Sequence, residues 1–383
     1  MKEYRIKKVL ELMKRNGLNG LLYATSANFQ YLADTPEYFW QRSSMNNIAG
    51  KFSVRSSPEA LFYLNDRGEG FICCIPSIKD SFADFKNLHV SYMDQMEDTI
   101  SVFIKEKRIG IGFDCHQYIK ETLIAIDSTI EIVDAEELLN DIRTIKDDQE
   151  IKVLRTNAEF TDRAVEYVCN NLKIGMTQRE IEHLLMDYGF QHQVPDFAFS
   201  PTCGLKTRNT ELAKEALTFS RDSVLVENTA IAFDVGYVIN GYCSDWGRTV
   251  YLGGASELVK NGYKALQAGQ RFMVESIIPH KTNNNELYDL VLKKVAELGY
   301  GSYLRFQDSG MLGHQIGIDC HEHPMINRDT DFILRPGMVF CSEPKMFFEN
   351  ECYLRVEDMI LVTESGAEFL SKFDRELFEL TTV

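Results

Sequence analysis

The first part of the chain combines one helical pattern with several short apolar runs. Residues 5–16 place apolar side chains at helical spacing, which predicts an amphipathic helix. Four apolar runs of strand length follow, separated by polar or helical stretches: 18–24, 60–64, 70–74 and 109–113. Because this alternation is typical of helices packed on a sheet, we predict an α/β domain over residues 1–140.

The pattern changes after a charged helical stretch at 135–171. Thr177 is followed by Glu180 three residues later, which predicts a capping box at the start of the next helix. Strand-like runs then dominate, interrupted by helical patterns at 256–277 and 285–298. We therefore predict a second, strand-rich domain over residues 141–383.

One predicted hairpin of the second domain carries two acids. Asn240-Gly241 is a strong two-residue turn signal between two apolar runs. With this pair as the loop, Asp234 and Asp245 become diagonal neighbours on one face of the hairpin. Diagonal positions are about 7–8 Å apart, so both carboxylates can reach a shared cation. A polar turn explains Asn240, but it does not explain two acids directed at one place.

A second predicted hairpin carries two further acids. With Asn350 at the centre of its loop, Glu343 lies directly opposite Glu357. A strand with an apolar pattern does not ordinarily bury a Glu without a partner. Two facing acids therefore need cations, or one of them must stay protonated.

Three histidines, His314, His321 and His323, lie within ten residues shortly before this hairpin. Any one of them alone is more often a satisfied core or surface residue. Glycines flank the segment that holds His314, and the clustering of the three favours a site. For His323 we favour the interpretation of an exposed turn residue.

Four carboxylates and one imidazole thus converge from two hairpins and a loop. Mostly oxygen ligands with a single nitrogen suit Mn²⁺, Fe²⁺, Co²⁺ or Zn²⁺ rather than a structural zinc held by thiolates. Two such cations, about 3.5–4 Å apart, ionise a bridging water and polarise a carbonyl in two-metal hydrolases. The predicted metal ligands are Asp234, Asp245, His314, Glu343 and Glu357.

In these local contexts the set resembles the pita-bread metallopeptidases, and within them the two-domain branch of prolidase, aminopeptidase P and creatinase. Three further motifs extend the resemblance over nearly the whole chain: Asn28-Phe29-Gln30-Tyr31-Leu32, Ile142-Arg143-Thr144-Ile145-Lys146 and Gly175-Met176-Thr177. The resemblance implies an N-terminal α/β domain followed by an α+β catalytic domain with a curved antiparallel sheet. It also implies a homodimer whose N-terminal domain helps to wall the active site. Phe39 and Trp40 are candidate wall residues, and an exposed aromatic cluster at a loop is an equally good interpretation of them.

The resemblance further implies a division of labour among the metal ligands. Asp234 would chelate one metal ion, and Asp245 and Glu357 would bridge both. His314 and Glu343 would complete the second metal position.

Three residues would act in catalysis by the same resemblance. Glu343 would also take the proton of the attacking water as a general base. His321 would stabilise the tetrahedral intermediate, and Arg355 would hold the carboxylates in place.

The chain also departs from the resemblance. It has no histidine between His192 and Asp234, and Gly310 stands where relatives commonly carry a histidine four residues before the metal-binding one. Both missing histidines would contact substrate rather than metal. We therefore expect the metal-dependent chemistry to be retained and the contacts with substrate to differ. Lys206 or Arg208 could supply another anchor, but we favour solvated loop charges for both.

Composition limits the binding partners and the cellular compartment that we expect for this chain. A net charge of −16 argues against nucleic acid or an anionic membrane surface, and no apolar run has the length of a membrane span. The N-terminus shows no signal region. Nine scattered cysteines suit free thiols in a reducing cytoplasm better than a disulfide framework.

Three functions are compatible with these observations. The first is hydrolysis of Xaa-Pro bonds in dipeptides or short peptides by a metal-bridging hydroxide, with two divalent ions, Mn²⁺ foremost and Co²⁺, Zn²⁺ or Fe²⁺ as alternatives. The second is a metal-dependent hydrolase or lyase acting on a small non-peptide substrate, which the missing histidines favour. The third is an inactive binding module, which the five retained ligands disfavour.

Overall fold

The computed structural model describes residues 2–35, 58–82, 85, 88–112, 115, 117–210, 220–376 and 379–380. Phe39 and Trp40, the predicted wall residues, lie outside these ranges. The chain forms two compact units, Met1–Arg143 and Thr144–Val383. Among the described helices, none is both long and apolar enough to cross a membrane.

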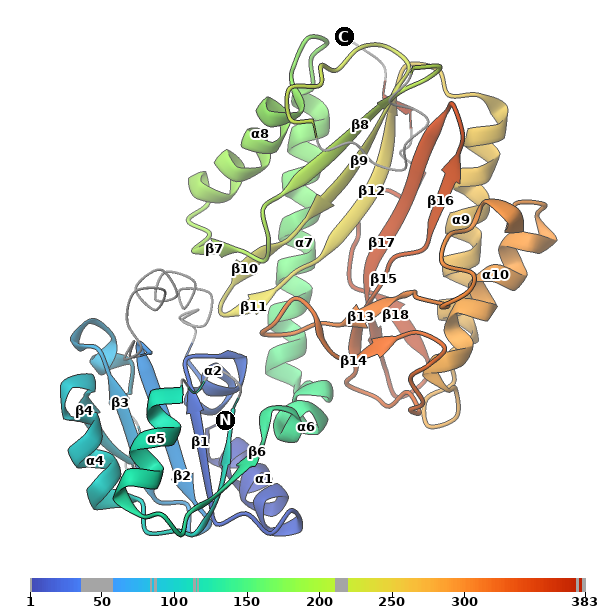
Figure 1. Cartoon of the computed structure of the whole chain (residues 1–383). Coiled ribbons are helices and arrows are strands. Elements are labelled where there is room, and N and C mark those ends of the chain that lie inside the picture. The colour runs from blue at the N-terminus through green and yellow to red at the C-terminus, as the bar shows by residue number, and fades with distance from the viewer. Residues whose placement is uncertain are drawn as a thin grey trace. The chain divides into compact units, whose positions relative to one another are not determined.

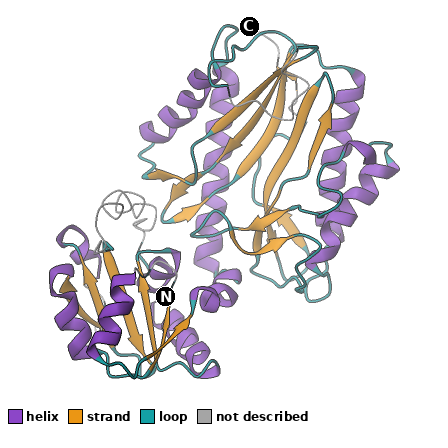
Figure 2. Cartoon of the chain, in the orientation of Figure 1, coloured by secondary structure: helices purple, strands orange, loops and turns teal. Residues whose placement is uncertain are grey.

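The first unit is built on a six-stranded mixed sheet with the order β4-β3-β2-β1-β5-β6 (Figures 1 and 2). Strand β1 pairs antiparallel with β2 and parallel with β5. Each of the four predicted strands corresponds to a strand of this sheet. The elements are α1 (Lys2–Arg15), β1 (Gly20–Ala24), α2 (Ala27–Ala33), β2 (Ala60–Asn65), β3 (Gly70–Cys74), β4 (Leu88–Tyr92), α4 (Met96–Phe103), β5 (Arg108–Ile111), α5 (Gln117–Ile126) and β6 (Glu131–Asp134).

The second unit is built on a ten-stranded sheet whose central order is β14-β13-β15-β17-β12-β9-β8. The same unit contains a smaller three-stranded sheet with the order β11-β10-β7. Its helices are α7 (Asp148–Asn171), α8 (Gln178–Gln191), α9 (Glu257–Ser276) and α10 (Leu287–Glu297), and the short α6 (Asn140–Thr144) spans the boundary between the two units in the sequence. Its strands are β7 (Asp196–Phe197), β8 (Thr202–Thr207), β9 (Thr229–Val235), β10 (Tyr237–Ile239), β11 (Tyr242–Cys243), β12 (Trp246–Leu252), β13 (Gly313–Gln315), β14 (Glu322–Ile326), β15 (Val339–Ser342), β16 (Lys345–Phe348), β17 (Cys352–Val362), β18 (Ala367–Phe369) and β19 (Glu379–Leu380).

The helical stretch expected over 135–171 is interrupted, so this prediction was wrong in its middle. A 3-10 helix and α6 end at Thr144, and α7 begins only at Asp148. Between them, Ile145 forms an isolated bridge with the distant Met338. Asp147 then caps α7 and forms a capping box with Glu150. Backbone pairing to another element thus overrides the local helical pattern.

Two other predicted helix starts are confirmed. The Thr177 hydroxyl accepts the backbone N–H of Glu180, and the Glu180 carboxylate accepts the backbone N–H of Thr177, which completes the predicted capping box. Ser256 caps α9 by accepting the backbone N–H of Val259. Each cap satisfies amide groups that the helix itself leaves without a partner.

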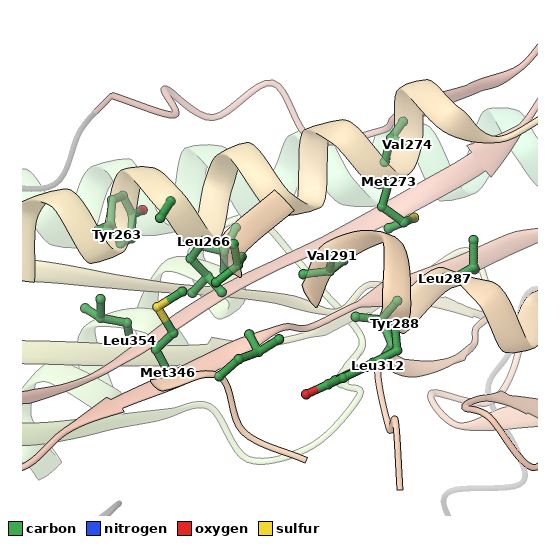
Figure 3. Packing of buried hydrophobic residues seen from close by; sticks show 14 of the residues in the cluster. Tyr263, Leu266, Met273, Val274, Leu287, Tyr288, Val291, Leu312, Met346 and Leu354 are labelled. Carbon is green, nitrogen blue, oxygen red and sulfur yellow. The ribbon is translucent and has the colours of Figure 1, made fainter. Parts of the chain in front are cut away.

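Helices cover one face of the large sheet and leave the other face to polar side chains. Helices α9 and α10 pack through Leu266 and Val291 against Leu354 of β17 (Figure 3). Helices α7 and α8 pack against β8, β9 and β12 in a second buried cluster. Side chains alternate between faces along a strand, so Arg355 and Glu357 of β17 project from the face opposite Leu354.

Candidate metal centre

Asp234 and Asp245 come from one hairpin, which has the predicted register. Asn240 and Gly241 both have positive φ, 52° and 77°, as the two-residue turn requires. Strands β10 and β11 pair around this turn, and β9 pairs with β12 so that Asp234 lies opposite Gly247. Asp245, two residues before Gly247, is therefore the diagonal neighbour of Asp234, as predicted.

Glu343 and Glu357 come from the second predicted hairpin. Strands β15 and β16 pair with β17 in one continuous register on either side of Glu343. This register places Glu343 opposite Glu357, with Asn350 in the loop at a positive φ of 62°. The predicted facing pair is thus confirmed.

The two hairpins meet where β12 pairs with β17. Here Gly247 lies opposite Glu357. A Cβ at position 247 would lie 2.6 Å from Glu357 Oε2 and 2.7 Å from Arg355 Nε, so glycine leaves the space that these two side chains fill. Gly247 was not among the site residues predicted from the sequence. A glycine inside an apolar strand pattern was the available signal.

His314 lies on β13 with only 1% of its surface exposed. Its Nδ1 is 3.0 Å from the backbone oxygen of Gln315, and its Nε2 is 3.3 Å from Asp245 Oδ2. With Nδ1–H donating to that carbonyl, Nε2 carries the proton that is donated to Asp245 in the metal-free chain, and loss of this proton leaves a neutral ring protonated at Nδ1 alone. This is the tautomer that a metal-ligating histidine needs.

Four buried side chains bring potential ligand atoms together: one atom each from Asp245, His314, Cys341 and Glu357 lies within 4.8 Å of the others. Among the described residues, Asp245 Oδ1 and Glu357 Oε1 have no hydrogen-bond partner, whereas Glu357 Oε2 is contacted by Arg355 Nη2 at 2.6 Å. Buried acceptors without partners are costly, and a divalent cation satisfies such oxygens together with an imidazole nitrogen. The residues present therefore fit a metal ion. Cys341 was not among the predicted ligands.

Arg355 connects the remaining acids to this group. Its guanidinium forms ion pairs with Asp234, with Glu343 Oε2 at 3.4 Å and with Glu357 Oε2 at 2.6 Å. Three of the four predicted acidic ligands thus contact one arginine. This is the position expected of the predicted clamp. Asp234 and Glu343 are the more open acids, with side chains 28% and 16% exposed.

Lys345 is a second cation in the site and was missed from the sequence. It begins β16, directly opposite Arg355 on β17, and its ammonium group donates to Glu343 Oε2. Burial and the charge of Arg355 lower its pKa, but the carboxylates of Glu343 and Glu357 outweigh them and raise the pKa above its ordinary value. The predicted hairpin register was the available signal, because it places Lys345, two residues after Glu343, on the same face and opposite Arg355.

Burial and charge act against each other at the acids. Burial raises the pKa of Glu357 well above its ordinary value despite the opposing charge of Arg355, and burial also raises the pKa of Asp234. Burial opposes ionisation of Asp245 too, but the hydrogen bond and charge of His314 prevail and lower its pKa. Carboxylates held in this way are stabilised in their ionised form by a bound cation.

His321, the predicted oxyanion stabiliser, lies beside the cluster and is exposed. Its ring centroid is 4.1 Å from that of His314, and one ligand atom each of Asp245, Cys320 and His321 lies within 4.8 Å of the others. Burial and the neighbouring His314 lower the pKa of His321. His323 is exposed as expected, but it lies in β14 rather than in a turn.

The interpretation of Lys206 as a solvated loop charge was wrong. Lys206 lies in β8 with 1% of its surface exposed, and its Nζ is 5.7 Å from the ring centroid of Phe347. Arg208 is half-buried and its Nε lies 2.9 Å from Glu351 Oε2. The segment was misassigned because its alternating polar residues conceal a strand that pairs with β9.

The chain is similar to proteins of a known family. A family model described as metallopeptidase family M24 matches residues 152–364. The Xaa-Pro dipeptidase of Pyrococcus horikoshii is 26% identical over 378 residues, which cover 97% of this chain and 98% of that protein.

Solved structures show the same fold. The crystal structure of the prolidase from Pyrococcus horikoshii OT3 has a TM-score of 0.80 at 24% identity and covers 98% of this chain and 100% of that one. The structure of an Xaa-Pro dipeptidase from Bacillus anthracis has a TM-score of 0.81 at 20% identity and covers 99% and 100%. These likenesses confirm the predicted fold class, an α/β N-terminal domain with an α+β pita-bread domain and its curved antiparallel sheet.

Proposed function

Because the chain belongs to metallopeptidase family M24, whose model matches more than half of its residues, we propose that it hydrolyses the Xaa-Pro bond of dipeptides or short peptides. Membership makes it a metal-dependent peptidase. The choice of the Xaa-Pro bond is supported by the names of its relatives, among them Xaa-Pro dipeptidases that match along nearly the whole chain.

The observation that carries the proposal is the buried cluster of Asp245, His314 and Glu357. Two of its carboxylate oxygens, Asp245 Oδ1 and Glu357 Oε1, have no hydrogen-bond partner among the described residues, and Nε2 of its imidazole faces one of the carboxylates. A purely structural cluster would satisfy these atoms with donors of the chain. Bound divalent cations would supply Lewis acidity and an ionised water to this cluster.

The chain's own residues then have distinct tasks. Asp234 and Glu343 flank the cluster and would complete the set of ligands. Glu343, whose side chain is partly open, would accept the proton of the attacking water. His321 stands at the exposed side of the cluster, where its ring N–H would donate to the oxyanion of the tetrahedral intermediate. Arg355 would hold three carboxylates in position without contacting substrate.

Several finer features stay predictions. Two ions per chain, the choice of Mn²⁺, a homodimer and a cytoplasmic location are expectations from the sequence and its resemblance. The assignment of Asp234 to one metal ion, and of Asp245 and Glu357 as ligands that bridge both ions, is also a prediction. A small peptide is the substrate class that fits the family.

Turnover of a small panel by the Mn²⁺-loaded protein tests the proposal. The panel holds Xaa-Pro dipeptides, an Xaa-Pro tripeptide and matched Xaa-Ala peptides, with Asp245→Ala as the blank. We expect cleavage of the proline peptides that disappears in the variant. Comparing the turnover of the Xaa-Pro dipeptides with that of the tripeptide distinguishes a dipeptidase from an aminopeptidase. If the protein binds metal and cuts none of these peptides, the proposal is wrong.

A further inference from the structure

A buried ion pair lies next to the loop of residues 317–321, which we call the His321 loop. Lys146 comes from the segment between α6 and α7, and its Nζ is 3.2 Å from Oε2 of Glu322, the first residue of β14. Only 1% and 5% of the two side chains are exposed. A buried ion pair often adds no more stability than apolar side chains of similar volume, so stability alone does not account for this one.

The backbone of Lys146 is held against the segment that leads into β15. Its N–H donates to the Gly337 carbonyl at 2.8 Å, and the preceding Ile145 forms a bridge with Met338. Gly337 has a positive φ of 86°, and a Cβ there would lie 2.9 Å from the Lys146 carbonyl oxygen, so glycine permits this close approach. The ammonium group thus projects from a fixed backbone.

The two carboxylate oxygens of Glu322 have different partners. Oε2 faces Lys146, whereas Oε1 accepts the backbone N–H of Ile318 at 3.1 Å and that of Asp319 at 3.3 Å. A Cβ at Gly317 would lie 2.8 Å from each of these oxygens, so glycine leaves the space that the carboxylate fills. The carboxylate therefore joins the His321 loop to Lys146.

Other residues of the His321 loop contact the metal cluster. The Cys320 thiol donates to Asp245 Oδ2 at 3.4 Å, and the ring centroid of His321 lies 4.1 Å from that of His314. The loop thus connects the buried ion pair with the proposed site. A change in the loop's conformation would move the imidazole of His321 relative to the cluster.

We propose that Lys146 is a positioning residue for His321: through Glu322 it holds the His321 loop in the conformation from which the imidazole donates to the oxyanion. The inference rests on the oxyanion role that the proposed function gives to His321. Removal of the ammonium group takes away one of the partners that fix the carboxylate, and the loop amides that bind Oε1 then shift with it.

The kinetic test compares wild type, Lys146→Met and Lys146→Arg on an Xaa-Pro dipeptide at saturating Mn²⁺. An oxyanion donor acts in the transition state, so Lys146→Met should lower kcat by about 10- to 100-fold and keep KM within about threefold of wild type. Affinity for a phosphinate isostere of the dipeptide, a tetrahedral mimic of the intermediate, should fall in parallel with kcat. Lys146→Arg keeps the charge and should recover most of the loss.

A double-mutant cycle with His321→Ala separates positioning from general damage to the site. His321→Ala alone should lower kcat by about 100- to 1,000-fold, the loss measured for a single oxyanion donor. Adding Lys146→Met should then change kcat by less than about threefold, because the residue that Lys146 positions is already gone. Losses that multiply in the double variant would show that Lys146 acts independently of His321 and would overturn the inference.

Hydrogen exchange on the metal-free full-length protein measures the loop itself. The amides of Ile318 and Asp319 should exchange faster in Lys146→Met than in wild type, because their acceptor is less firmly held. Arg5→Met is the matched control, since it removes a buried cation 3.1 Å from Asp34 in the first unit. It should lower the urea midpoint without changing kcat or the exchange of these two amides.

The outcomes distinguish the inference from the proposed function. If Lys146→Met does not fold, as judged by circular dichroism, Glu322→Gln replaces it, because one amide oxygen cannot serve both Lys146 and the loop amides. An unchanged kcat in the folded variant, with or without faster exchange, overturns the inference alone. A wild type that cleaves no Xaa-Pro peptide overturns the proposed function and the inference with it.

Discussion

Gly247→Ala tests whether the close approach of β12 and β17 positions the metal ligands. The added Cβ would lie 2.6 Å from Glu357 Oε2, about 0.8 Å short of the 3.4 Å at which ordinary contact begins. The carboxylate of Glu357 is fully buried and lies against Arg355, so it has little room to move. We expect overpacking of this kind to cost about 1–3 kcal/mol of unfolding free energy.

Function should suffer more than stability. A displacement on the order of 1 Å at a reacting centre costs about 100-fold in rate, so we expect kcat/KM on an Xaa-Pro dipeptide to fall by about that factor. Affinity for Mn²⁺ should fall as well, because Glu357 is a predicted ligand. The measurements are urea unfolding, Mn²⁺ calorimetry and initial rates at saturating Mn²⁺.

The chain offers a matched control for this substitution. Gly254 lies two residues after the end of β12, and a Cβ there would meet nothing within 4 Å. Gly254→Ala should therefore leave stability, metal affinity and turnover near wild type. If Gly247→Ala behaves like Gly254→Ala in all three measurements, the argument that the pairing of β12 with β17 requires glycine at position 247 is refuted.

Two further predictions concern stability away from the metal ligands. Lys146→Met should lower the unfolding free energy by about 1–3 kcal/mol, because it removes the ammonium group 3.2 Å from the buried carboxylate of Glu322, which keeps its other partners such as the backbone N–H groups of Ile318 and Asp319; an unchanged urea midpoint would contradict this. Thr177→Ala should cost about 1 kcal/mol by removing the cap of α8, whereas Thr177→Ser should keep it. Equal urea midpoints for these two variants would show that the cap does not stabilise the fold.

Local signals in the sequence predicted both acidic hairpins correctly. The Asn240-Gly241 turn fixes the register that makes Asp234 and Asp245 neighbours, and centring the other hairpin on Asn350 fixes the register that faces Glu343 with Glu357. A turn determines register because each residue of displacement moves every side chain to the opposite face. These predictions needed no knowledge of distant contacts.

Distant contacts supplied what the sequence left out. Strands β12 and β17 are far apart in the chain, and no local pattern states that Gly247 will face Glu357. Cys341 enters the cluster for the same reason, since its neighbour His314 comes from β13, whereas Lys345 follows from the register of the predicted hairpin itself. The convergence of His314 with the acids was predicted from the combined set of residue types and a family resemblance, not from spacing alone.

The position of the site follows from the pairing of the two hairpins. Even-numbered residues of β17, such as Leu354 and Val356, face the helices, and the odd-numbered Arg355 and Glu357 face the other way. Pairing of β12 with β17 brings the acids of one hairpin onto the same face as those of the other. Four acids on one buried face would repel one another, so the fold needs cations there even before metal binds. Arg355 meets this need for three acids, and Lys345 meets it at Glu343. The residues that offset this repulsion in the metal-free chain are then the same residues that hold the carboxylates in position.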